Sequence, residues 1–289
     1  MPPREPDFPE RDDLPKQSAR TILFQFVIFP LGIVMIAVAV FLLFGKLASD
    51  EQSIPDYLSE IRSGSAHERW QAAYQLSKSL KRGEAAQYPN LEPQVEAIYL
   101  QSKTDDPRIR RYLSMVLGTL GDRRATPPLL DGLNDREPDN RIYALLALGE
   151  LKDPDSVPRI DLMAVDEDKD VRKTAYFVLG EIGDKRGLIA LDHGLADDVP
   201  EVRWNAAMSL TRFNDRRAIP VLREMLDRSR FNEVRDMRED QKEDAMIMAM
   251  APYARLAGGD ARPDLQRIAA ADSSLRVRAE AKSALQSLR

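Results

Sequence analysis

The feature of this sequence that most constrains its fold is an internal repeat with a period of 31 residues. Two columns of the repeat hold the same residue type in four successive units: Arg110, Arg141, Arg172 and Arg203, and Asp122, Asp153, Asp184 and Asp215. A fixed period of this length is typical of a solenoid, in which each unit buries its apolar face only against its neighbours. Residues that recur in every unit are therefore expected to be structural.

Each unit of the repeat has the pattern of a helical hairpin. In one unit, Val171 and Arg172 open a helix that carries apolar residues at Ala175 and Leu179, and a glycine-aspartate turn follows. A second apolar segment, residues 188–195, completes the unit. Apolar residues at this spacing lie on one face of a helix, so the sequence predicts two packed helices per unit.

The hairpins are predicted to extend over most of the chain. Arg69 heads a first unit, and Val277 and Arg278 begin a last half-unit, which gives about six hairpins over residues 66–289. The period is interrupted twice. About ten extra residues fall in the connection 81–93, and about 14 fall between Asp227 and Glu243.

The motif Asp-x-x-Val-Arg-x-x-Ala-x-x-x-Leu-Gly resembles HEAT repeats, particularly the short repeats of the phycobilisome-lyase HEAT-like subgroup. The resemblance is strongest over residues 105–227 and weaker over 66–104 and 243–289. It implies an all-α, right-handed α-solenoid whose first helices line a concave groove for partners. It also implies a polar ladder, with each arginine reaching an aspartate six residues earlier: Asp135 to Arg141, Asp166 to Arg172 and Asp197 to Arg203.

The turn within each hairpin has its own recurrent residues. Gly121, Gly183 and Gly259 are expected to supply positive φ at a helix end, and the following aspartates are expected to accept backbone hydrogen bonds. A proline column fits the first turn of the second helix, where no N–H is needed. It consists of Pro127, Pro158 and Pro220.

The chain before the repeats has a different character. Residues 1–20 are rich in proline and charge and are expected to be a disordered tail. Residues 21–44 contain no charge, and 24 residues of helix are long enough for a bilayer core of about 30 Å, so we expect a single-pass transmembrane helix. A cleaved signal peptide would be shorter. More Lys and Arg precede the span than follow it, which favours a cytoplasmic N-terminus and an extracytoplasmic solenoid. A linker and a short helix are expected over 45–65.

Composition disfavours several classes of function. The net charge of -5 gives no general attraction for nucleic acid, and the chain has no cysteine for thiolate chemistry or Cys-type zinc sites. Its two histidines, His67 and His193, lie in different repeats. Deoxyhypusine hydroxylase has a similar fold, but that family needs several His-Glu pairs, and only His67-Glu68 is present here. We therefore predict a protein without catalytic activity, cofactor or metal.

Binding residues are expected where the first helix of each unit points away from its core. On a helical wheel these are the positions one and five after the arginine, and they are largely apolar or aromatic. The candidates for partner binding are Trp70, Tyr74, Arg111, Ile142, Lys173, Phe177, Trp204 and Met208. Burial between adjacent repeats is the alternative explanation, and it applies more to the fifth position. Trp70, Ile142 and Trp204 are thus the expected exposed anchors.

These observations predict a membrane-tethered, non-catalytic scaffold that holds a partner protein in the groove of a HEAT-like solenoid. The alternative is an enzyme or chaperone accessory of the phycobilisome-lyase kind that acts on a cofactor-bearing protein. The insertion after Asp227 is a candidate second contact surface, whereas the methionine cluster over residues 245–250 is expected to fill a helix core.

Overall fold

The structure is a computed structural model that describes residues 23–48, 53–80, 87–234 and 236–288. The chain divides into two compact units, Met1–Ser53 and Ile54–Arg289. Within the described residues every regular element is a helix, so the all-α prediction is confirmed there. The expected disordered tail over residues 1–20 lies outside the described part of the chain.

The first unit holds a π-helical turn, η1 (Phe24–Ile28), followed by α2 (Phe29–Ala48). Pro30 explains the irregular start, because it has no N–H for a bond to the carbonyl four residues back. Directly before it, the Phe29 N–H bonds to the Phe24 carbonyl five residues back. Among the residues that the structure describes, no helix combines the length and apolarity needed to cross a membrane. The transmembrane helix expected over 21–44 is therefore not supported.

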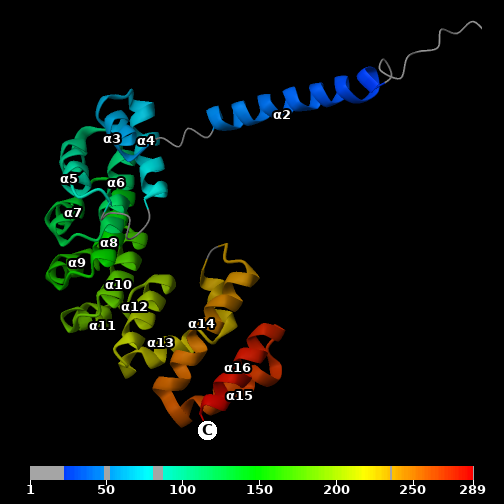
Figure 1. The fold of residues 1–289 in the computed structure, drawn as a ribbon. Helices are drawn as coiled ribbons and strands as arrows, with labels where there is room; N and C mark the ends of the chain where they lie inside the picture. Colours follow the sequence, from blue (N-terminus) through cyan, green and yellow to red (C-terminus); the bar gives the residue numbers. More distant parts are fainter. Residues whose placement is uncertain (1–22, 49–52, 81–86, 235, 289) are drawn as a thin grey trace, which may run out of the picture. The chain divides into compact units, whose positions relative to one another are not determined.

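The second unit is a solenoid built from two columns of helices (Figure 1). The first column lies on the inner side of the bend and consists of α4 (Ala66–Ser79), α6 (Pro107–Leu120), α8 (Pro138–Leu151), α10 (Lys169–Ile182), α12 (Pro200–Arg212), α14 (Glu239–Ala257) and α16 (Leu275–Ser287). The second column consists of α3 (Ile54–Ser63), α5 (Leu91–Gln101), α7 (Thr126–Gly132), α9 (Val157–Met163), α11 (Leu188–Gly194), α13 (Ile219–Glu224) and α15 (Arg262–Ala271). Over the described residues, six hairpins from α4 to α15 are flanked by α3 and α16.

Within the hairpins the turn follows the predicted chemistry, with one correction. Each first helix from α6 to α12 is followed by a residue with positive φ at the same position of the repeat: Gly121, Lys152, Gly183 and Asn214. Asp122, Asp153, Asp184 and Asp215 then accept a hydrogen bond from the backbone N–H two residues on. In the later turn the positive φ belongs to Gly258 and not to Gly259, because a longer 3-10 segment, η9 (Gly258–Ala261), replaces the usual turn.

The remaining 3-10 segments fall at the connections between helices. Four of them occupy the hairpin turns: η4 (Arg123–Ala125), η5 (Pro154–Ser156), η6 (Lys185–Gly187) and η7 (Arg216–Ala218). The other two are η3 (Ser102–Thr104) and η8 (Arg228–Glu233). The proline column stands in the first turns of α7, α9 and α13, as predicted.

The arginine column does form a polar ladder, but its carboxylates come from the opposite direction to the one predicted. The arginines donate to the backbone carbonyls of the loop six residues earlier: Arg141 to Asp135, Arg172 to Asp166 and Arg203 to Asp197. The ion pairs reach the next loop, 25 residues later: Arg110 to Asp135, Arg141 to Asp166 and Arg172 to Asp197, with closest N–O distances of 3.0, 2.7 and 2.8 Å. Arg141 and Arg172 thus each join two consecutive loops, and the ladder links one repeat to the next.

The second interruption of the period changes this arrangement. Position 228, where the next ladder aspartate would stand, is an arginine. Arg203 therefore pairs with Glu224 at 2.6 Å, while Arg228 pairs with Asp272 at 2.8 Å and Glu239 at 2.9 Å. The inserted residues fold as η8 and place Phe231, which is 0% exposed, in the core.

Candidate functional site

The candidate site is a groove on the first column of helices, formed by α6, α8 and α10. Its cavity has a volume of about 630 Å³. Met115, Leu146 and Phe177 line it, and each is 39% exposed. These side chains hold the fifth position after the ladder arginine in three successive repeats, so the 31-residue period brings them into one row. Residues next to them in each helix are buried in the solenoid core.

Close packing of the helices fixes the floor of this groove. A Cβ atom added to Gly118 would lie 2.9 Å from Ala147 Cα, so α6 and α8 approach closely there. Between α10 and α12, a Cβ on Gly180 would lie 2.5 Å from Ser209 Oγ, which donates to the Tyr176 carbonyl at 2.8 Å. Larger residues at these glycines would push the helices apart.

Polar groups border the apolar row on both sides. Towards the helix starts, Arg111 pairs with Asp139 at 2.5 Å and its guanidinium lies 5.6 Å from the centre of the Tyr143 ring. Towards the helix ends, Glu150 and Glu181 line the cavity together with one cation, Lys152.

The other charged candidate, Lys173, is half-buried at the start of α10. It donates a short hydrogen bond to Asp170, and this bond is the main cause that holds the pKa of the Asp170 carboxyl below its usual range. The Asp170 carboxyl is therefore ionised at neutral pH.

The structure reverses the predicted order of exposure between the first and the fifth position after the ladder arginine. Trp204 was expected to be an exposed anchor, but it is 5% exposed, so that expectation is wrong. The ring of Phe231 packs against it edge to face with centroids 5.1 Å apart, and Glu224 accepts its indole N–H at 3.3 Å. The inserted segment η8 supplies the phenylalanine, so the interruption of the period covers this position.

The other expected anchors are half-buried. Trp70 lies under the Arg108 guanidinium, 4.0 Å from the ring centre, and meets His67 edge to face. Tyr74 packs against Tyr112 with centroids 5.1 Å apart. Two further candidates, Ile142 and Met208, pack partly against the core. Of the eight candidates, Phe177 alone is exposed, and it joins Met115 and Leu146, which were not among the candidates.

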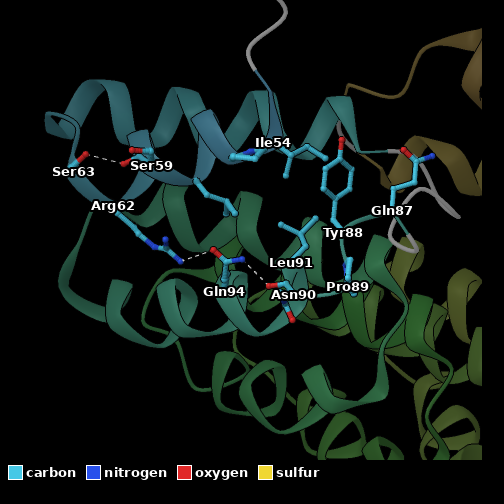
Figure 2. A pocket seen from close by; sticks show the side chains of 12 residues that line it. Ile54, Ser59, Arg62, Ser63, Gln87, Tyr88, Pro89, Asn90, Leu91 and Gln94 are labelled. Atoms are coloured by element: carbon cyan, nitrogen blue, oxygen red, sulfur yellow. Dashed lines mark hydrogen bonds between the residues drawn. The ribbon is translucent and has the colours of Figure 1, made fainter.

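A second hollow, not predicted from the sequence, lies between α3 and α5 at the N-terminal end of the solenoid (Figure 2). Its volume is about 650 Å³. Tyr88, in the connection just before α5, extends towards Ile54, and Arg62 donates to Gln94 across the gap at 3.1 Å. The first interruption of the period falls in the connection between α4 and α5, which carries Tyr88. That irregularity was the only signal of the hollow in the sequence.

The histidines do not form a common site with other ligand residues. His67 begins α4 and contacts Trp70, whereas His193 is exposed near the end of α11. Across the described ranges of the chain, no group of three or more His, Cys, Asp or Glu residues is arranged to hold a metal ion.

Comparison with known proteins identifies the repeats. The family model for HEAT repeats matches residues 95–161 and 158–240, which together span just over half of the chain. A chain of the CpcE–CpcF complex of phycocyanin lyase from Nostoc sp. PCC7120 has the same fold, with a TM-score of 0.51 and 17% identity. That similarity covers 83% of this chain and 97% of the other. No curated protein matches the sequence.

Two further solved structures are similar to a lesser degree. Kap121p bound to RanGTP has 16% identity and a TM-score of 0.48 over 86% of this chain and 30% of that one. Human deoxyhypusine hydroxylase in complex with glycerol has 19% identity and a TM-score of 0.33 over 89% of this chain and 98% of that one.

Proposed function

This chain belongs to the HEAT repeat family, and we propose that it is a scaffold that binds a partner protein in the α6–α10 groove. HEAT solenoids are extended surfaces built from nearest-neighbour contacts, and such surfaces suit the capture of other proteins. The solved complex of CpcE with CpcF joins proteins of this fold, which supports the proposal by analogy.

The observation that carries the proposal is the row of three exposed apolar side chains in one cavity. Met115, Leu146 and Phe177 stand in line on three successive helices, whereas single exposed apolar residues elsewhere need no explanation. Contiguous apolar surface rimmed by polar groups is typical of protein interaction sites.

The test is affinity capture with the full chain and two groove variants, Leu146→Asp and Phe177→Asp. The matched control is Ile189→Asp, since Ile189 lies on α11 in the outer column and is 69% exposed. We expect each groove variant to lose at least about tenfold of the captured partner, because interface anchors often contribute about 2 kcal/mol. The circular dichroism melt should match the wild type. Equal capture by groove and control variants would remove the basis of the proposal.

Membrane tethering through residues 21–44 is a separate hypothesis. It is supported only by the uncharged sequence and by the exposed apolar side chains of α2, such as Phe41 and Leu42. Alkaline carbonate extraction tests it, with a chain lacking residues 21–44 as the control. Retention of the full chain alone in the membrane pellet would support tethering, and protease digestion of intact spheroplasts would then show which side holds the solenoid.

Phycobilin chemistry is the second candidate, since the fold matches a chain of a phycocyanin lyase complex. A scaffold without cofactor should leave the absorbance spectrum of a free bilin unchanged on titration. A saturable spectral shift that the groove variants abolish would favour the lyase-like alternative.

A further inference from the structure

We infer that the starts of α6 and α8 hold a second binding site, which takes a planar amide group of a ligand, either in the main chain of a peptide or in a free carboxamide. This site shares no lining residue with the α6–α10 groove. The inference goes beyond the proposed function and does not depend on it.

The site is a cavity of about 670 Å³ between two consecutive loops. One wall comes from residues 102–107, at the approach to α6, and the other from residues 131–137, between the end of α7 and α8. Arg110 and Asn140 line the cavity from the first turns of α6 and α8, and each is only 4% exposed. The cavity is therefore bordered by two buried polar side chains.

Asn140 breaks the apolar pattern of its repeat position. In the neighbouring repeats the residue before the ladder arginine is Ile109, Val171 or Val202, and these side chains are 0–1% exposed. Asn140 is buried like them, but its Oδ1 atom accepts no hydrogen bond among the described residues. An unpaired buried acceptor lowers stability, and an apolar residue would pack here without this loss. Such an exception to the local pattern is typical of functional sites.

Arg110 departs from the pattern of the polar ladder. The ladder arginines of α8, α10 and α12 donate through Nη1 to a carbonyl of the loop before them. Within the described residues Arg110 makes no such bond: its Nη2 donates to the Tyr99 hydroxyl at 3.4 Å, and its Nε lies 3.0 Å from the Asp135 carboxylate. The loop before it contains η3, and the connections before α8, α10 and α12 have no such segment. One N–H group of a buried guanidinium thus remains for a ligand.

The charges at the cavity are already compensated, which favours a neutral ligand. Asp135 pairs with Arg110, and Asp131 pairs with Lys103 at 2.7 Å. An added carboxylate would be repelled by the two acids, and an added cation would be repelled by Arg110. The groups that remain to be paired are a donor on Arg110 and an acceptor on Asn140. A planar amide matches both, because its oxygen accepts a hydrogen bond and its N–H donates one.

Asn140 can turn its oxygen towards the cavity without a change of the backbone. The Oδ1 atom is shielded from solvent, but the χ2 torsion that orients the amide of asparagine is soft. An incoming N–H group therefore draws the oxygen outwards at little cost. Binding should change the surroundings of the Asn140 amide itself, which provides a direct readout.

The test titrates the full chain with four probes and follows the side-chain amide signals of Asn140 in nitrogen–proton correlation spectra. The probes are a blocked hexaglycine, a blocked hexamer of N-methylglycine that has no N–H, propionamide and propionate. We expect a saturable shift with hexaglycine or propionamide. The N-methylglycine hexamer and propionate should bind at least about tenfold more weakly, because neither can donate to Asn140.

The two amide probes distinguish the two sources of the ligand. They are compared at equal concentrations of amide groups. Tighter binding of hexaglycine assigns the site to a peptide main chain. Equal or tighter binding of propionamide assigns it to a free carboxamide.

The variant Asn140→Val restores the residue type of the neighbouring repeats and removes the acceptor. We expect its melting temperature to rise by a few degrees and its binding of the amide probes, followed through the backbone signals of residues 131–137, to weaken at least about tenfold. The matched control is Asn205→Ala in α12, where the Asn205 amide donates to the Glu201 carbonyl at 2.9 Å. This control should bind the probes like the wild type and should gain no stability.

Three binding results would overturn the inference: no saturable shift with either amide probe, equal binding of the N-methylglycine hexamer, or unchanged probe binding by Asn140→Val. A lower melting temperature of Asn140→Val would also contradict it, because Asn140 would then stabilise the fold. Leu146→Asp should leave probe binding unchanged, so a failure of this site is distinguishable from a failure of the α6–α10 groove.

Discussion

Ion pairs link neighbouring repeats in two different ways in this solenoid. One is found in the regular repeats from α6 to α12, and the other in the interrupted region that follows Asp227. In α6, α8 and α10, the ladder arginine finds its aspartate 25 residues later in the next loop. After Asp227 the ladder position that should hold an aspartate holds the positively charged Arg228, which reaches forward 44 residues to Asp272. A ladder contact is therefore set by the neighbouring repeat and is not a property of one unit.

The two regions also differ in which positions stay on the surface: Phe177 holds the fifth position after the ladder arginine and Trp204 the first. In α10, Phe177 stays on the surface because the neighbouring helices leave the row open. In α12, Trp204 is covered by Phe231 from the insertion. Here α14 packs less extensively against α12 than against α13 or α16, so the regular stacking of the first column of helices is weakened between α12 and α14. The interruption thus buries a position that is half-buried in the earlier repeats.

The largest expected effect concerns the ladder in the regular region. Arg141→Ala should lower the free energy of unfolding by about 3–5 kcal/mol, because it leaves the buried Asp166 carboxylate without its partner. Urea denaturation measures it. The matched control, Arg267→Ala, removes an exposed arginine that pairs with Asp264 in its own turn, and it should change stability by less than about 1 kcal/mol.

Arg228→Ala sharpens the comparison with the interrupted region. The Arg228 side chain is more exposed than that of Arg141, so we expect a smaller loss. A loss as large as that of Arg141→Ala would mean that both regions depend on the ladder equally, and the contrast drawn here would be wrong.

The next effect concerns the cover over Trp204. Phe231→Ala should destabilise the solenoid by about 3 kcal/mol, because it removes a fully buried phenylalanine ring. The emission of Trp204, measured in a Trp70→Phe background, should shift to the red as water reaches the ring. An unchanged emission would show that the insertion does not shield Trp204 in solution.

The smallest effect concerns Glu92, near the first interruption of the period. Burial raises the pKa of its carboxyl above 4.5, although the Arg124 charge opposes the shift. The folded state therefore holds the proton more tightly than the unfolded state, and stability falls as the pH rises above 4.5 through the raised pKa.

Glu92→Gln should accordingly raise the melting temperature by a few degrees at pH 7, and the gain should disappear below about pH 4. Thermal melts of both proteins across this range measure it. A gain that stays constant with pH would contradict a titration of this carboxyl.

The sequence predicted those features that depend on one repeat alone. The hairpin turn follows from local chemistry, since an aspartate after a positive-φ residue caps the next segment wherever it occurs. Lys152 and Asn214 adopt the same conformation as Gly121, so the conformation belongs to the turn and not only to glycine.

Features that depend on contacts between distant residues were not predictable in the same way. The burial of Trp204 requires the insertion to fold back, and the hollow beside Tyr88 requires α3 and α5 to stand apart. The exposed row was missed in part for the same reason. Met115 and Leu146 share their repeat position, the fifth after the ladder arginine, with Phe177. Only the packing of three helices shows that this position is more open than the first position after the arginine.

Site-specific photocrosslinking tests the central claim, that the α6–α10 groove holds a partner protein. A photoreactive phenylalanine in place of Phe177 is compared with the same group in place of Ile189 on the outer column. The account predicts a single protein adduct from position 177, absent from position 189 and lost when Leu146→Asp is added. No adduct at position 177, or the same adduct from both positions, would contradict it.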